Sequence, residues 1–140
     1  MIRATPQMRD LASRLVTAET GKPKASDPEY PAAFNVCEKL RPHLATLMGN
    51  EGFRAVLSRA LTVTSAEVKW LAEVQVNVGG AWGGWDKPEA QVAPKELRES
   101  GVLLVAQLLG LLVVFIGEKL TLHLVRDVYP EISFEDLNHT

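Results

Sequence analysis

The sequence predicts an all-α, single-domain fold: an irregular bundle of five or six helices around one buried apolar helix, residues 101–117. That stretch reads GVLLVAQLLGLLVVFIG and contains no charged side chain. Several other segments repeat apolar residues at helical spacing, which predicts helices with one buried face. Because 140 residues are enough to bury one core, we treat 1–140 as a single domain.

The first two helices are marked by residues that begin and end helices. A Thr-Pro pair at 5–6 predicts the first start, because a hydroxyl side chain caps a helix and proline suits the first helical position. Gly21 is expected to end that helix. The second is expected to run from about Ala32 to Gly49. Because Pro42 lacks the N–H of a helical hydrogen bond, we expect either a kink near residues 38–41 or a division into two short helices.

The middle of the chain changes from helical to strand-like periodicity. A helix is expected to begin at Asn50, and the capping-box spacing of residues 64–67 predicts that another short helix follows. Alternating valines then predict a strand and, with a glycine pair as the turn, a small glycine-rich, β-like flap at residues 74–85. Residues 79–93, rich in glycine and containing two tryptophans, are expected to form an irregular loop.

The last long helix is expected to begin at Pro94 and to end at Pro130. An unbroken helix of that length would be long for so small a chain, so a break at Gly101 or Gly117 is expected. The remaining residues, 131–140, are expected to form a short and partly mobile tail.

Two environments suit the apolar segment 101–117: a protein core or a membrane. At helical rise its 17 residues span about 25 Å, less than the hydrocarbon thickness of about 30 Å. Charges of both signs flank it, with no basic cluster on one side and no aromatic belt. These features favour a helix buried by the rest of the chain, and a membrane role remains the alternative.

Small residues follow one face of this segment at positions Ala106, Gly110, Gly117 and Thr121. Small side chains let another backbone approach closely. The stripe therefore predicts either tight packing within the chain, which we favour, or the seam of a dimer.

Two further groups of residues are candidates for function. Trp82 and Trp85 lie in the glycine-rich loop, where tryptophan either docks a partner or folds back as a lid over the core. His123 and Asp127 lie one helical turn apart, where the two side chains can pair. A solvated polar face is the favoured interpretation of that pair, since exposed pairs contribute little.

Several kinds of chemistry lack a local signature in this sequence. A net charge of −2 offers no basic face for nucleic acid, and the three histidines lack the spacing of metal ligands. No cofactor motif is recognised. Cys37, the single cysteine, lies on an apolar stripe and is expected to be a packing residue; a lone cysteine and an N-terminus without an apolar signal run indicate the cytoplasm.

These observations favour a non-enzymatic protein-interaction or regulatory module, oligomeric or a subunit of a larger assembly. Its partner is expected to be a protein, or a second copy through self-association. One alternative is a protein that acts on or is anchored to a membrane through residues 101–117. Another is a ligand-binding protein or enzyme whose site forms only in three dimensions, for example from Gln107, His123 and Asp127.

Overall fold

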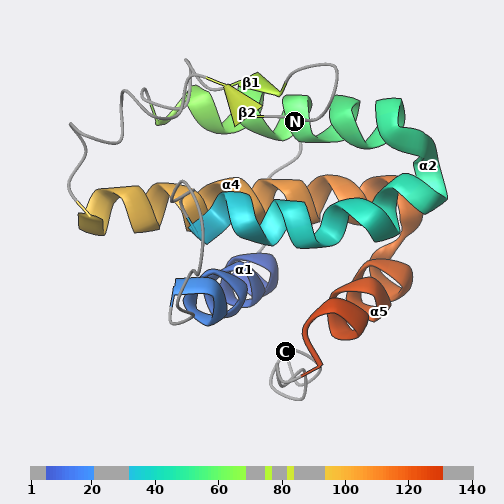
Figure 1. Cartoon of the computed structure of the whole chain (residues 1–140). Coiled ribbons are helices and arrows are strands. Elements are labelled where there is room, and N and C mark those ends of the chain that lie inside the picture. The colour runs from blue at the N-terminus through green and yellow to red at the C-terminus, as the bar shows by residue number, and fades with distance from the viewer. Residues whose placement is uncertain (1–5, 21–31, 69–74, 77–81, 84–93, 131–140) are drawn as a thin grey trace.

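The computed structural model describes residues 6–20, 32–68, 75–76, 82–83 and 94–130. These residues contain four helices, α1 (Pro6–Thr20), α2 (Ala32–Ser65), α4 (Pro94–Ile116) and α5 (Glu118–Val128) (Figure 1). The predicted all-α fold is therefore confirmed. The larger count of five or six helices is not confirmed. Helix α2 itself consists of two helical halves joined at Gly49, whose φ of 82° and ψ of 160° are not helical, and this is where the sequence predicts one helix to end and the next to begin.

Helix α4 lies in the middle of the bundle. It crosses between α1 and the second half of α2, and the first half of α2 runs alongside it (Figure 1). Helix α2 can follow α4 twice because it folds back at Gly49, whose φ of 82° is one that residues with side chains rarely adopt. The described helices thus surround α4 with apolar faces, as the sequence predicts.

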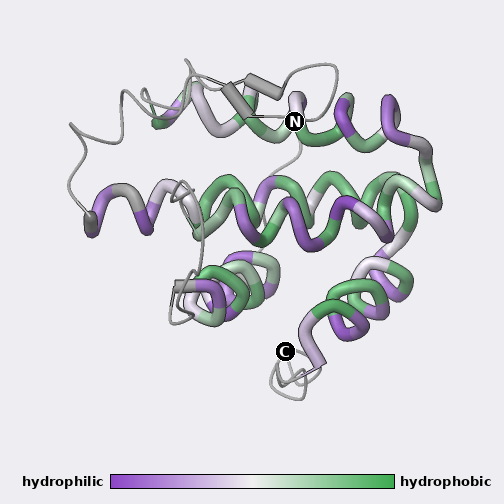
Figure 2. Tube along the Cα trace, viewed as in Figure 1, coloured by the Kyte–Doolittle hydropathy of each residue, from purple (hydrophilic) through white to green (hydrophobic). Residues whose placement is uncertain are grey.

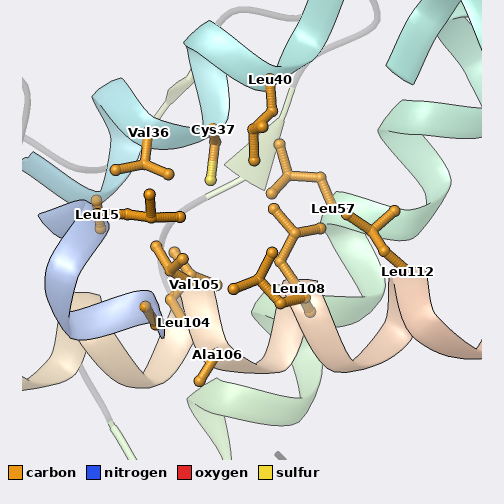
Figure 3. Close-up of a cluster of buried hydrophobic side chains, with 14 of the residues drawn as sticks. Leu15, Val36, Cys37, Leu40, Leu57, Leu104, Val105, Ala106, Leu108 and Leu112 are labelled. Carbon is orange, nitrogen blue, oxygen red and sulfur yellow. The ribbon is translucent and has the colours of Figure 1, made fainter. Parts of the chain in front are cut away.

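The core is formed by the central part of α4 and the helices around it. Every residue from 104 to 112 is buried, so this part of α4 has no face toward solvent. The close-up in Figure 3 shows side chains of three elements packed together: Leu15 of α1, Val36, Cys37, Leu40 and Leu57 of α2, and Leu104, Val105, Leu108 and Leu112 of α4. Burial of each leucine contributes about 1.5–3 kcal/mol relative to exposure.

The predicted burial of the whole segment 101–117 is wrong at its C-terminal end. Val114 and Phe115 are exposed, and Gly117 is exposed as well. The reason is geometric, because α1 and the two halves of α2 cover the middle of α4 and not its last turn. Figure 2 shows this long apolar helix extending to the end of the bundle, with hydrophilic residues at its opposite, N-terminal end.

The helix breaks occur at glycines. Helix α2 continues through Pro42 and is interrupted at Gly49, so a division into two short helices at Pro42 is wrong. The break between α4 and α5 is at Gly117, where φ is 92°, and this confirms one of the two predicted positions. Helix α1 begins at Pro6, as its Thr-Pro signal predicts, and α2 begins at Ala32, the position expected for it.

Thr64 does not begin a new helix. It lies in the last turn of α2, where its hydroxyl donates to the Ala60 carbonyl at 2.7 Å and its own carbonyl accepts from the amides of Glu67 and Val68. The hydroxyl is therefore committed within α2 and cannot cap the next segment. The short helix predicted to follow extends into residues 69–74, which lie outside the described residues.

Two strands of two residues each, β1 (Gln75–Val76) and β2 (Trp82–Gly83), pair antiparallel, with Val76 opposite Trp82. Four residues are too few to establish the flap predicted at 74–85. The other residues of that segment, most of the loop 79–93 and the tail 131–140 lie outside the described residues. These parts of the expected architecture stay predictions.

The contact between Gly101 of α4 and Ala33 of α2 is expected to tolerate no added methyl group. A Cβ at Gly101 would lie 2.9 Å from the Cβ of Ala33, so Gly101→Ala should lower the free energy of unfolding by about 1 kcal/mol despite the higher helix propensity of alanine. Urea denaturation measures the change. Adding Ala33→Gly to this variant should recover the lost free energy of unfolding. If the double variant is no more stable than Gly101→Ala alone, a steric cause is contradicted.

Candidate functional site

The large apolar side chains exposed in the described residues come from three elements that meet at one end of the molecule. They are Leu47 (49% exposed), Val114 (59%), Phe115 (61%) and Leu120 (38%). The bend of α2, the end of α4 and the start of α5 lie together at that end (Figure 1). We call these four residues the apolar end. Exposed apolar groups gathered in this way are typical of a binding surface.

The glycine break explains why this end is uncovered. Gly117 interrupts the helix, yet its amide still donates to the Val113 carbonyl at 2.9 Å, and its carbonyl accepts from the amide of Thr121 at 3.1 Å. The chain therefore changes direction at a single residue and α5 turns away from the axis of α4 (Figure 1). Val114 and Phe115, in the last turn of α4, are left exposed by this change of direction.

Two open hollows adjoin the apolar end. The first, of about 660 Å³, is formed at the α4–α5 corner, and its apolar lining is Ile116, Leu120 and Leu122. The second, of about 430 Å³, lies between α2 and α5 and includes Leu47 and Leu120. Since Leu120 lines both hollows, the two form one continuous surface along α5. Concave apolar surface of this kind can accept an inserted side chain.

The charges at this end are balanced. Glu118, Lys119 and Arg126 line the first hollow, and Asp127 lines the second. All four side chains are exposed, two acidic and two basic. The surface is therefore apolar with a polar border of no net charge, an arrangement common in protein interfaces.

His123 and Asp127 form the predicted pair, but at the surface. Their Nε2 and Oδ2 atoms are 3.8 Å apart, and the side chains are 67% and 52% exposed. At that distance and exposure the pair contributes little to stability. Gln107 lies elsewhere, buried in the middle of α4, and does not line the hollow that His123 and Asp127 share, so the structure does not bring these three residues together.

The predicted tryptophan site lies largely outside the described residues. Trp85 is not among them, and only the backbone of Trp82 is described, in β2.

The small-residue stripe divides between two environments. Ala106 and Gly110 are in the fully wrapped part of α4, and Thr121 is buried in α5, where its hydroxyl donates to the Gly117 carbonyl at 2.7 Å. Among the described residues, no atom would lie within 4 Å of a Cβ placed on Gly117. Close packing within the chain at Gly117 is therefore a wrong prediction, because this glycine is required by its positive φ. The alternative dimer seam stays a prediction.

A buried polar contact joins three helical regions that are far apart in sequence. The Tyr129 hydroxyl donates to Glu19 Oε2 at 2.8 Å, and Lys39 Nζ lies 2.7 Å from the same oxygen. Tyr129 is completely buried and the Glu19 side chain is 1% exposed. We call these three residues the clasp. It fixes the C-terminal end of α5 against α1 and α2, and the sequence contains no local signal for it.

Cys37 is buried in the core, as its apolar stripe predicts. Burial raises the pKa of its thiol far above the ordinary value, chiefly because a thiolate there would be desolvated. The folded protein is thus expected to hold the thiol unreactive toward alkylating reagents.

Because the pKa of the Cys37 thiol is raised in the folded protein, we expect the protein to lose stability at high pH. Above a pH of about 8.5 the unfolded chain releases the thiol proton while the folded chain retains it, so the free energy of unfolding should fall by about 1.4 kcal/mol per pH unit through this group. Urea denaturation from neutral to alkaline pH measures the slope. Cys37→Ala should remove the part of the slope that comes from the thiol. If the free energy of unfolding falls equally steeply with pH in the unaltered chain and in Cys37→Ala, the thiol is not the cause.

Gln107 is the other unusual polar group of the core. Its side chain is 5% exposed, and its amide has no hydrogen-bond partner in the part of the chain that the structure describes. A buried unsatisfied amide costs about 1–3 kcal/mol. Gln107→Leu is therefore expected to raise the free energy of unfolding by about 1 kcal/mol, measured by urea denaturation. A destabilised variant would show that the amide is satisfied in solution.

The described residues contain no cluster of metal ligands and one helix of membrane-spanning length. Among the described residues, no group of three or more His, Cys, Asp or Glu side chains is placed to hold a metal ion. One described helix, over Arg98–Ile116, is long and apolar enough to cross a membrane, and 56% of that apolar window is buried in the bundle. A core helix passes the same test of length and composition.

Comparison of the chain with protein-family models, with curated proteins and with solved structures finds no match.

Proposed function

We propose that this chain is a protein-interaction module of the cytoplasm that docks a partner protein through the apolar end. The single observation that carries the proposal is the collection of exposed Leu47, Val114, Phe115 and Leu120 at one end of the bundle. Leaving such side chains in water is unfavourable, and burying the remaining exposed surface against a partner recovers that free energy.

Phe115 is the expected anchor of the interaction. It is the most exposed large apolar side chain in the described residues, and aromatic residues dominate the binding energy of many interfaces. Complete burial of a phenylalanine contributes about 1.5–3 kcal/mol. The hollows beside it offer space for apolar side chains of the partner.

The finer architecture belongs to the same proposal. It includes a five- or six-helix bundle with a glycine-rich flap at 74–85 and a second contact region at Trp82 and Trp85. Tryptophan in a glycine-rich segment supports this second region, since such residues are enriched where proteins dock.

Photo-crosslinking at the anchor tests the proposal. Incorporating p-benzoylphenylalanine in place of Phe115, in cells that express the protein, should give an irradiation-dependent adduct with a protein partner. The matched control places the same residue at Lys95, which is exposed at the other end of α4 and should give no such adduct. Absence of a protein adduct at position 115, or an adduct with lipid alone, would contradict the proposal, and the latter would favour the membrane alternative.

A further inference from the structure

We infer that the partner of the apolar end is a second copy of this chain, bound through a two-fold symmetric contact. The inference rests on the proposed function and names its partner. Three features of the same end support it: a protruding anchor, a hollow next to it, and a balanced set of charges.

The anchor and the hollow occur together on one chain. Phe115 protrudes from the last turn of α4, and the following residues, Ile116 and Leu120, line the hollow at the α4–α5 corner. A two-fold contact requires one surface to be complementary to itself, because each residue pair occurs twice. A surface with an adjacent protrusion and hollow meets this requirement: each Phe115 can enter the hollow of the other copy.

The charges favour a second copy over a membrane or a strongly charged partner. Glu118 and Asp127 are matched in number by Lys119 and Arg126 around the hollows. An anionic lipid surface is recognised by clusters of basic residues, which this border lacks. In a symmetric dimer, by contrast, a border with equal numbers of acidic and basic groups produces no net repulsion between the two copies.

The helical framework is suited to holding this surface in place. The backbone hydrogen bonds on either side of Gly117 preserve helical geometry up to the corner, and the clasp at Tyr129 fixes the other end of α5. The two sides of the hollow are thus supported by hydrogen-bonded elements of the bundle. A preformed surface loses less conformational entropy on association than a disordered one.

Sedimentation velocity of the purified full chain, without detergent and over a wide range of concentration, tests the inference. A monomer–dimer equilibrium is expected. Phe115→Asp should raise the dimer dissociation constant at least about 30-fold, as expected for loss of a central anchor. Ala66→Asp, an equally charged change at an exposed position outside the apolar end, should leave that constant unchanged.

A mixing experiment tests the reciprocal geometry. Phe115→Ala removes the anchor and keeps the hollow, whereas Leu120→Trp keeps the anchor and fills the hollow. Each variant alone should dimerise more weakly than the unaltered chain, and the mixture should form a heterodimer tighter than either homodimer, because one anchor then meets one open hollow. Circular dichroism identifies any variant that fails to fold, and Phe115→Asp then provides the test on its own.

The results separate this inference from the proposed function. An unaltered chain that stays monomeric at every concentration, or a dimer insensitive to Phe115→Asp, overturns the second copy as partner. In that case an adduct with a different protein at position 115 would still support the interaction module. Loss of both the dimer and any protein adduct would overturn both.

Discussion

Replacing Leu108 with alanine is expected to lower the free energy of unfolding by about 3 kcal/mol. Leu108 is fully buried in the centre of α4, among side chains from α2 and from α4 itself (Figure 3). Removing its branched end loses the transfer free energy of the side chain and leaves a cavity that packed helices only partly close. Urea or thermal denaturation of the detergent-free protein measures the loss.

The matched control for this prediction is Val114→Ala on the same helix. Val114 is 59% exposed, so its truncation should change stability by less than about 0.5 kcal/mol. Similar losses for the two variants would contradict the distinction between a wrapped centre and an uncovered end of α4.

The second large effect is expected at the clasp. Tyr129→Phe should lower the free energy of unfolding by about 2 kcal/mol, because it removes a 2.8 Å hydrogen bond to a carboxylate while both groups are buried. Phenylalanine keeps the ring, so the change reports on the hydroxyl. Equilibrium denaturation gives the magnitude.

A double-mutant cycle shows whether the effect belongs to Glu19. If it does, Tyr129→Phe should cost much less in a Glu19→Met background, which has no oxygen to accept the hydrogen bond, than in the unaltered chain. Equal costs in the two backgrounds would mean that the hydroxyl is stabilised by something other than this carboxylate.

The helical framework could be predicted from the sequence because its signals are local. Pro6 and Ala32 begin helices, and Gly49 and Gly117 break them, where the cap signals and the need for positive φ indicate. Pro42 was misleading since a helix can continue through a proline when the surrounding packing holds it. The capping-box pattern at Thr64 was misleading for a similar reason: its hydroxyl bonds within α2 instead.

The candidate site could not be predicted in the same way, because exposure depends on where other helices stop. Val114 and Leu108 belong to one uninterrupted apolar run, and only the positions of α1 and α2 make one exposed and the other buried. The clasp was missed because Glu19 and Tyr129 are 110 residues apart in sequence. His123 and Asp127, by contrast, are neighbours on one helix, so their pairing was accessible to sequence reasoning.

The central claim is that α4 is the core helix of a folded bundle, with a buried centre and exposed apolar side chains in its last turn. Native-state hydrogen exchange of detergent-free protein, with and without phospholipid vesicles, tests it most directly. The amides of residues 104–112 should exchange only through global unfolding, at the same rate whether or not vesicles are present. Rapid exchange of these amides in water, with protection appearing when vesicles are added, would show instead that the helix belongs in lipid.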